Sequence, residues 1–360
     1  MSKFKKLAAS VGKVLLFVVL FLCIYNYTND AFRGSNMHNA IPFLADQPDE
    51  SYDVVLAGSC HMQLSIQPAQ LFSQYGIAAC NTGSASQSVP TSYFLIKEMI
   101  DRHSPELVVL DIFTLHFTEL ASTRAWVHEA LDGFPLSISK AKAINALVED
   151  NREEFYLPYT FYHRRWKELE KADYHLETSV AEKYQFSVDG IVPFPEPFTL
   201  VAPQETAEIP QVPREYLEKI IQLCKESGTK LLLTVSPYRA DILENDIERA
   251  EYIQRTFNYV EKLASEYGVD YLNSLYYVDE MGLNFSEDMV DSSHVNAIGS
   301  EKVSAFYGRY LTENYDLPDR SDDRDFEDWH EDCREYWSVL EQRQALCRQP
   351  KQEAPAEVQE

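Results

Sequence analysis

Five short apolar runs alternate with segments of helical spacing between residues 53 and 311. Short runs without polar alternation are typical of strands buried on both faces, which occur in parallel sheets. Parallel neighbours need a crossover connection, and a helix between successive strands supplies it. The runs are Asp53–Ala57, Ala78–Asn81, Leu107–Ile112, Lys230–Val235 and Val269–Leu272.

The segments between the runs have the sequence marks of helices. Proline opens the first of them and Gly228 follows the third, which are ordinary positions for these residues at a helix start and end. The alternation predicts an α/β domain over residues 50–312, with three α/β/α layers around a mostly parallel five-stranded sheet. The predicted helices are Pro68–Tyr75, Thr91–His103, Arg214–Ser227, Ile247–Tyr267 and Asn296–Leu311.

The N-terminus carries an apolar segment. Three lysines within Met1–Lys6 precede the unbroken apolar run Val14–Tyr25. As a helix, Leu7–Tyr25 would cover about 28 Å, close to the thickness of the hydrocarbon core of a bilayer. We predict a cytoplasmic N-terminus at residues 1–13 and a single transmembrane anchor at residues 14–27. The helix of the anchor could begin as early as Leu7. The lysines place the main domain outside the cytoplasm.

A cleaved signal peptide is the alternative interpretation of this segment. No small-x-small cleavage site follows the apolar run cleanly, since Asn29-Asp30-Ala31 is a poor match. Bulky residues before Cys23 also make a poor lipoprotein site. An uncleaved anchor in the cell membrane is therefore favoured.

The charge balance excludes one class of partner. The net charge is −25, from 57 acidic and 32 basic residues. Binding to phosphates requires a basic surface, so nucleic acid is not expected as a partner. The six cysteines form no CxxC pair, and no Cys/His cluster has zinc spacing, so we expect no metal and no cofactor.

Residues 113–213 interrupt the alternation of strands and helices. An interruption of about 100 residues is far longer than an ordinary loop. Its first part is helical and aromatic, and its second part, Phe186–Pro213, is rich in proline. A lid or substrate wall over the sheet and a cap that only packs on the domain both remain open. His163, Arg164 and Arg165 are either an anion site or, as is commoner, solvated helix charges.

Two further segments flank the domain. Residues 28–49 are polar, with Gly, Pro and Asn, and predict a tether. Residues 313–360 form a C-terminal extension, in which Asp316–Glu335 holds ten acidic residues and three arginines. Apolar residues nevertheless recur there at helical spacing, which predicts an acidic amphipathic helix packed on the domain and a disordered tail from Gln349.

Chemically useful residues follow the first two predicted strands. Gly58-Ser59-Cys60-His61 comes directly after the first strand, and Asn81-Thr82-Gly83-Ser84 directly after the second. The carboxyl ends of parallel strands meet at one edge, where open α/β sheets bind ligands. Cys60 offers a nucleophile at that edge, and backbone N–H groups from both loops could bind an oxyanion.

A carboxylate and an imidazole lie near the end of the domain, in Asp291-Ser292-Ser293-His294. A spacing of three allows Asp291 to fix the ring of His294 while the other ring nitrogen faces a nucleophile. The order of the three blocks along the chain predicts that they meet in one site.

These blocks resemble the SGNH/GDSL hydrolases over about Asp53 to Leu311. The similar segments are DVVLAGSCHMQLSIQPAQLF, AACNTGSASQS and DMVDSSHVNAIGSEKVSAFYGRYL. The first is similar to the extracytoplasmic subfamily that reads GSSH rather than GDSL. The resemblance implies a flavodoxin-like fold, and relatives such as the D-alanyl-lipoteichoic acid transfer and alginate O-acetylation proteins, which handle acyl groups on cell-surface polymers.

The resemblance also implies roles for individual residues. Cys60 takes the nucleophile position, His294 the base and Asp291 the residue that orients it. Gly83 takes the oxyanion position. The remaining candidates for oxyanion or substrate binding are Asn81, Ser59 and His61, of which His61 either donates to substrate or caps the turn.

The chain departs from the family pattern in two places. Cys60 replaces the usual serine, and Ser59, one residue out of register, is the alternative nucleophile. No GxND follows the third strand, where Thr114 or His116 could substitute for the asparagine. Cys80 is either a disulfide partner of Cys60 or, as we favour, a buried thiol.

These features predict an acyl esterase or O-acyltransferase that acts on a cell-envelope glycan. The expected partner is a cell-surface polysaccharide or acylated glycan, and a membrane-bound acyltransferase is a further candidate. The alternative is a non-catalytic SGNH-like module that binds a polysaccharide or such an acyltransferase. The missing serine and asparagine favour the module, whereas the DxxH block favours the enzyme.

Overall fold

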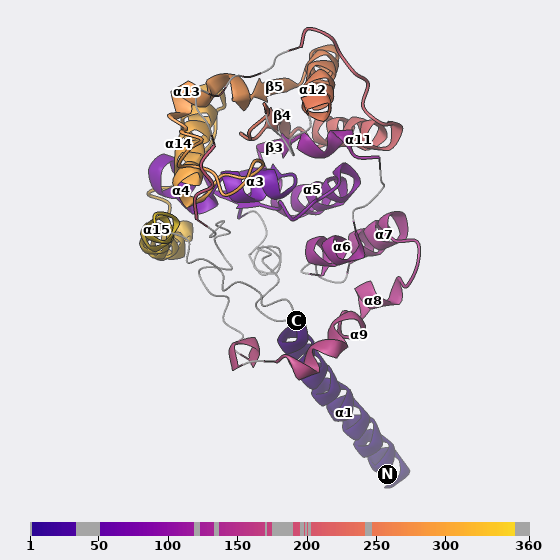
Figure 1. Ribbon diagram of the computed structural model, residues 1–360. Helices are drawn as coiled ribbons and strands as arrows, with labels where there is room; N and C mark the ends of the chain where they lie inside the picture. The colour runs from indigo at the N-terminus through magenta and orange to yellow at the C-terminus, as the bar shows by residue number, and fades with distance from the viewer. Residues whose placement is uncertain are drawn as a thin grey trace, which may run out of the picture.

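A five-stranded sheet lies at the centre of the protein (Figure 1). The strand order is β2-β1-β3-β4-β5, and every neighbouring pair is parallel. This is the order of flavodoxin-like doubly wound sheets, so the predicted α/β class is confirmed. The strands are β1 (Val54–Ala57), β2 (Ala79–Asn81), β3 (Leu107–Asp111), β4 (Lys230–Val235) and β5 (Asp270–Asn273).

The computed structural model describes most of the chain. The described residues are 2–33, 51–118, 123–132, 137–169, 171–174, 190–194, 198, 200, 203–241 and 247–349. Some residues of the proline-rich part of the predicted insertion, most of the predicted tether and all of the predicted disordered tail except Gln349 lie outside them.

Helices cover both faces of the sheet because successive strand residues point to opposite sides. Val55 and Val108 pack against one set of helices, and Val54 and Val109 against the other. The first set is α5 (Val89–His103), α11 (Gln211–Ser227) and α12 (Ile247–Tyr267). The second set is α3 (Cys60–Ser65), α4 (Pro68–Tyr75), α13 (Val278–Met281) and α14 (Ala297–Asn314).

The insertion between β3 and β4 contains short helices and 3-10 turns. Its first two helices pack on α5 in a separate apolar cluster. The ring of His128 is stacked between Phe155 and Phe161, with centroids 3.8 and 3.9 Å away. The elements are η1 (Phe113–His116), α6 (Arg124–Leu131), α7 (Ile138–Leu147), α8 (Glu153–Tyr156), α9 (Tyr159–Tyr162), η2 (His163–Lys167) and η3 (Lys171–Tyr174).

The N-terminal helix α1 (Ser2–Arg33) extends away from the domain (Figure 1). Ala9–Asn29 is long and apolar enough, by length and composition, to cross a membrane. The helix begins before Leu7 and continues past Thr28, so the start of the predicted tether is helical. No glycine or proline interrupts the chain from Lys13 to Arg33, which explains the extra turns.

The C-terminal extension packs on the domain through η6 (Arg324–Phe326) and α15 (Glu327–Cys347), which lies beside α4. The buried hydroxyl of Tyr336 donates to Gln70 Oε1 at 3.0 Å. The guanidinium of Arg320 holds Asp53, at the start of β1, through two hydrogen bonds of 2.8 and 2.9 Å. Short elements also follow β5, at η5 (Ser274–Tyr277).

Candidate active site

The turn from β1 into α3 positions Cys60. Gly58 has a φ of +149°, and a Cβ at this position would lie 2.7 Å from Cβ of Asp111. Only glycine allows β1 and β3 to approach so closely at this point. Ser59 then caps α3, accepting a hydrogen bond from the N–H of His61 at 3.4 Å. Cys60 is therefore the first residue of the helix, at the carboxyl edge of the sheet.

His294 lies against Cys60 although the two are 234 residues apart in the chain. Nε2 of His294 is 3.0 Å from Sγ of Cys60. On the far side of the ring, Nδ1 is 2.9 Å from both carboxylate oxygens of Asp291. The structure thus brings the three predicted residues together in the order thiol, imidazole, carboxylate.

Backbone contacts hold the loop that carries Asp291 and His294. Oδ1 of Asp291 accepts the N–H groups of Ser293 at 2.7 Å and of His294 at 2.8 Å. The N–H of Arg239, which follows β4, donates to the carbonyl of Ser292 at 2.9 Å. These bonds fix the carboxylate and the imidazole relative to the sheet edge.

The protonation of Cys60 and His294 is coupled. Burial opposes a charged thiolate, but the hydrogen bond and charge of His294 outweigh it and lower the pKa of Cys60. Burial likewise opposes an imidazolium, but Asp291 and the Cys60 sulfur raise the pKa of His294 to about 10. Burial also opposes ionisation of Asp291, yet its bonds to His294 lower its pKa. The site therefore favours a thiolate–imidazolium pair over the two neutral groups.

The loop after β2 is engaged with α3. The side-chain N–H groups of Asn81 donate to the carbonyls of Met62 and Ile66 at 3.1 and 3.0 Å. Its Oδ1 accepts the N–H of Gly83 at 3.0 Å. The amide expected to bind an oxyanion is thus already paired with Oδ1 of Asn81, while the side-chain N–H groups of Asn81 tie β2 to the nucleophile helix.

Ser86, farther along this loop, contacts the nucleophile. Its backbone N–H hydrogen-bonds Cys60 and favours the thiolate. Ser86 has a φ of +47°, in the left-handed region that is uncommon outside glycine. The preceding residue, Ala85, donates its N–H to Glu129 of α6 at 3.1 Å. No local sequence pattern indicated either Ser86 or Glu129.

Two further imidazoles lie beside the site. His61 stacks on Phe113 with ring centroids 3.7 Å apart, and its centroid is 5.1 Å from that of His294. Its buried Nδ1 has no hydrogen-bond partner among the described residues, and neither has the buried Nε2 of His116. Burial lowers the pKa of both rings, to about 4 for His116, so both are neutral at pH 7.

The third strand ends in a buried carboxylate that the sequence did not single out. Asp111 accepts the N–H groups of Phe113 at 3.0 Å and Ser236 at 2.8 Å, which joins the ends of β3 and β4. Burial raises its pKa to about 6. Thr114 is buried in η1, and no side-chain hydrogen bond is described that would give it the role of the missing asparagine.

Other predicted residues serve structural contacts. Cys80 is a buried free thiol on β2, and burial raises its pKa. The hydroxyl of Ser59, the alternative nucleophile, caps α3. The imidazole of His294 contacts Cys60 instead. Arg165 pairs with Asp173 at 2.9 Å. In the described ranges no group of His, Cys, Asp and Glu is arranged to hold a metal ion.

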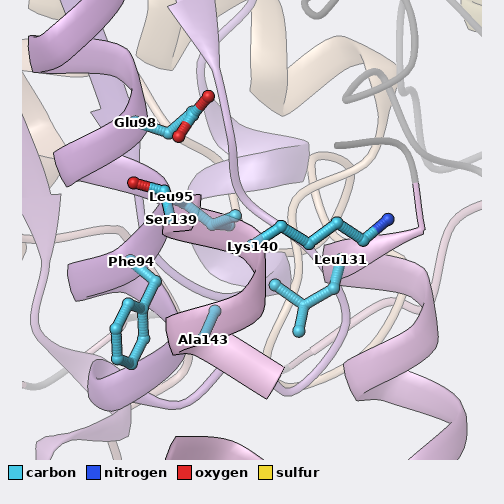
Figure 2. Close-up of a pocket in the computed structure, with 7 residues that line it drawn as sticks. All are labelled: Phe94, Leu95, Glu98, Leu131, Ser139, Lys140 and Ala143. Carbon is cyan, nitrogen blue, oxygen red and sulfur yellow. The ribbon is translucent and has the colours of Figure 1, made fainter. Parts of the chain in front are cut away.

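A small pocket lies away from these residues, between α5, α6 and α7 (Figure 2). None of the predicted site residues lines it, so it does not belong to the Cys60 site. Its lining residues are Phe94, Leu95, Glu98, Leu131, Ser139, Lys140 and Ala143.

Comparison with known proteins adds little. No protein-family model and no curated protein matches the chain. A crystal structure of a candidate acylhydrolase from Bacteroides fragilis is similar at 12% identity, with 76% of this chain and 92% of that chain covered and a TM-score of 0.37. A likeness this low carries no argument.

Proposed function

We propose that the protein is an extracytoplasmic, membrane-anchored acyl esterase or O-acyltransferase that acts on a cell-envelope glycan with Cys60 as its nucleophile. One observation carries the proposal: the 3.0 Å contact between His294 Nε2 and Cys60 Sγ, with Asp291 bound to the other ring nitrogen. A nucleophile, a base and an orienting carboxylate in this order form an arrangement that can carry out acyl transfer.

The first half-reaction forms a thioester. The Cys60 thiolate attacks the acyl carbonyl, and the resulting tetrahedral oxyanion collapses with loss of the alcohol oxygen. The imidazolium of His294 gives its proton to that leaving oxygen, so the products are an acyl-Cys60 thioester, a free hydroxyl and a neutral imidazole. Asp291 stabilises the charged imidazolium before this transfer.

The second half-reaction releases the acyl group. The neutral imidazole of His294 takes a proton from water or from an acceptor hydroxyl, whose oxygen attacks the thioester. Collapse of the second tetrahedral intermediate expels the Cys60 thiolate and restores the ion pair. Water yields a free acid, and a glycan hydroxyl yields a new ester.

Two groups support the proposal as oxyanion donors in place of Gly83. The backbone N–H of Cys60, in the first turn of α3, has no hydrogen-bond partner among the described residues. The second group is Nδ1 of His61, the next residue, which is buried and has no hydrogen-bond partner among the described residues. A neutral imidazole carries one N–H, which could donate to the developing charge.

The polymer substrate and the location are supported by other features. The apolar helix at Ala9–Asn29 would hold the domain at the membrane surface, where cell-envelope glycans are. The resemblance of the three sequence blocks to SGNH-type proteins that act on surface polymers points the same way.

A non-catalytic binding module is the second candidate. The observation in its favour is that the Gly83 amide is hydrogen-bonded to Asn81 rather than open to substrate. Such a module would bind a polysaccharide or a membrane-bound acyltransferase without forming a covalent bond.

Intact-mass spectrometry separates the two candidates. The full chain in detergent is incubated with an activated acetyl ester and quenched in acid. The enzyme proposal expects a mass increase of one acetyl group, which is lost in Cys60→Ala and kept in Cys80→Ala. A properly folded chain that acquires no acetyl group on Cys60 would leave the binding module as the better account.

A further inference from the structure

The insertion contacts the end of the N-terminal helix. The rings of Phe32 on α1 and Tyr159 on α9 pack edge to face with centroids 5.1 Å apart. Arg165 in η2 donates to the carbonyl of Phe32 at 2.6 Å and is held by Asp173 of η3 at 2.9 Å. Ala31 is only 2% exposed. α9 and η2 are therefore attached to α1 at its C-terminal end, as Figure 1 shows.

The position of this contact along α1 sets its depth in a bilayer. Ala9–Asn29 is the apolar span of 21 residues, and a hydrocarbon core of about 30 Å needs about 20 helical residues. Phe32 lies three residues beyond Asn29, which corresponds to about 4.5 Å of helix. The headgroup layer adds roughly 5–8 Å on each side of the core. The contact with α9 and η2 consequently falls at headgroup depth.

The side chains that this part of the insertion exposes suit that depth. Trp166 is 62% exposed, Leu157 48% and Tyr156 36%. Tryptophan and tyrosine concentrate where membrane and water meet, because their rings are apolar with one polar group. Each of the three side chains is thus open to solvent over a third or more of its surface.

The local charge also suits a lipid surface. The segment His163–Lys167 contains three basic residues and no acidic one, in a chain whose net charge is −25. Arg165 is occupied by Asp173, but Arg164 and Lys167 are exposed. Lys167 lies 5.4 Å from the ring of Trp166. A basic site beside an exposed tryptophan is attracted to anionic headgroups, whereas the acidic remainder of the domain is repelled.

We propose that the segment 156–167 docks on the outer surface of the bilayer, with Trp166, Leu157 and Tyr156 among the headgroups and Arg164 and Lys167 on anionic lipid phosphates. The inference rests on the proposed membrane anchor, since α1 sets the depth. The bilayer then holds the domain at two adjacent places, the end of α1 and this segment. A second attachment restricts rotation of the domain about the axis of α1.

Depth-dependent quenching of tryptophan fluorescence tests the docking. The full chain is reconstituted into vesicles of phosphatidylcholine and phosphatidylglycerol. A fraction of the lipid molecules carries bromine, which quenches tryptophan fluorescence, on the acyl chains near the headgroup. The chain has four tryptophans, so the quenched signal is assigned by substitution. Trp166→Phe should lose most of the quenching. Trp126→Phe should keep it, because Trp126 is also exposed but lies on α6.

Charge reversal provides the second arm. Arg164→Glu with Lys167→Glu should reduce the quenching of Trp166 on vesicles that contain phosphatidylglycerol. Lys142→Glu with Lys262→Glu makes the same change in net charge on exposed residues of α7 and α12 and should have no effect. Vesicle-bound chains with equal quenching in the parent and in Trp166→Phe would overturn the docking while leaving the anchor and the chemistry in place. Chains that do not float with vesicles would overturn the anchor and the docking together.

Discussion

The carboxylate of Glu129 on α6 accepts a hydrogen bond from the backbone N–H of Ala85 at 3.1 Å, which connects the insertion to the loop beside the nucleophile. Ala85 precedes Ser86, whose left-handed backbone aims an N–H at Cys60. The insertion contributes a residue that positions the site, which a cap packed only on the scaffold would not do. Burial raises the pKa of Glu129, so the bond is made at the expense of solvation.

Removing this acceptor should reduce the reactivity of Cys60. In Glu129→Ala the loop loses its hold, the Ser86 amide moves from the sulfur, and we expect alkylation by iodoacetamide at pH 7 to slow roughly fivefold, equivalent to about 1 kcal/mol for one hydrogen bond. Glu129→Gln keeps an acceptor oxygen and should retain most of the rate. Glu149→Ala, at an exposed position, is the control. An unchanged alkylation rate in Glu129→Ala would show that the position of the loop does not depend on Glu129.

Cys60 should be alkylated before the other domain cysteines near pH 7. Its pKa is lowered, whereas burial raises the pKa of Cys80 and raises that of Cys224 to about 12. A lowered pKa means that the thiolate persists to lower pH, so the midpoint of the rate–pH profile should lie below that of a free thiol. His294→Ala removes the positive partner and should move the midpoint to higher pH. Peptide mapping after timed alkylation measures both effects, and equal rates for Cys60 and Cys80 would contradict them.

The imidazole of His294 should remain protonated well above neutral pH. Its pKa is about 10 because Asp291 and the Cys60 sulfur stabilise the imidazolium. Cys60→Ser replaces an ionised group by a neutral hydroxyl, so the pKa of His294 should fall. NMR titration of the ring protons measures the shift. The serine variant should also retain some esterase activity, since the same base can activate a hydroxyl. A ring that titrates near pH 6.5 in the parent chain, the usual histidine value, would refute the ion pair.

Gly58→Ala should destabilise the domain more than another glycine substitution in the left-handed region. At Gly58 the new Cβ would lie 2.7 Å from Asp111 Cβ, whereas at Gly228, with a φ of +80°, a Cβ meets nothing within 4 Å. Gly228→Ala therefore incurs backbone strain alone, about 1–2 kcal/mol, and Gly58→Ala adds a clash between β1 and β3. Chemical denaturation measures the free energy of unfolding of the two variants. An equal loss in both would mean that the added Cβ at Gly58 is accommodated without a clash between β1 and β3.

Protease added outside spheroplasts should digest the domain that follows Thr28. The three lysines before the apolar helix predict that the N-terminus lies in the cytoplasm and the domain outside it. Immunoblotting with an antibody to the C-terminal extension measures the loss, and a cytoplasmic protein serves as the control for intact membranes. Full protection of the domain would reverse the topology.

Local pattern alone determined the five strands. Runs such as Leu107–Leu110 are apolar throughout because both faces of a central parallel strand are covered, and that requirement is visible in a few consecutive residues. The position of Cys60 and Asn81 at one sheet edge followed equally, since each residue comes at the carboxyl end of a predicted strand. The end of α1 was less well determined, because the polar residues after Thr28 suit a helix and a tether alike.

Only the tertiary structure decided how the site residues are used. Whether Ser59 or Cys60 faces His294 depends on where α3 begins, and the cap assigns the hydroxyl to the helix and the thiol to the imidazole. The bond between Gly83 and Asn81 is local, whereas the bonds from Asn81 to Met62 and Ile66 depend on the approach of α3 to β2. The Glu129 contact spans 44 residues and two helices. Such contacts have no periodicity in the sequence, because they arise from the packing of one element on another.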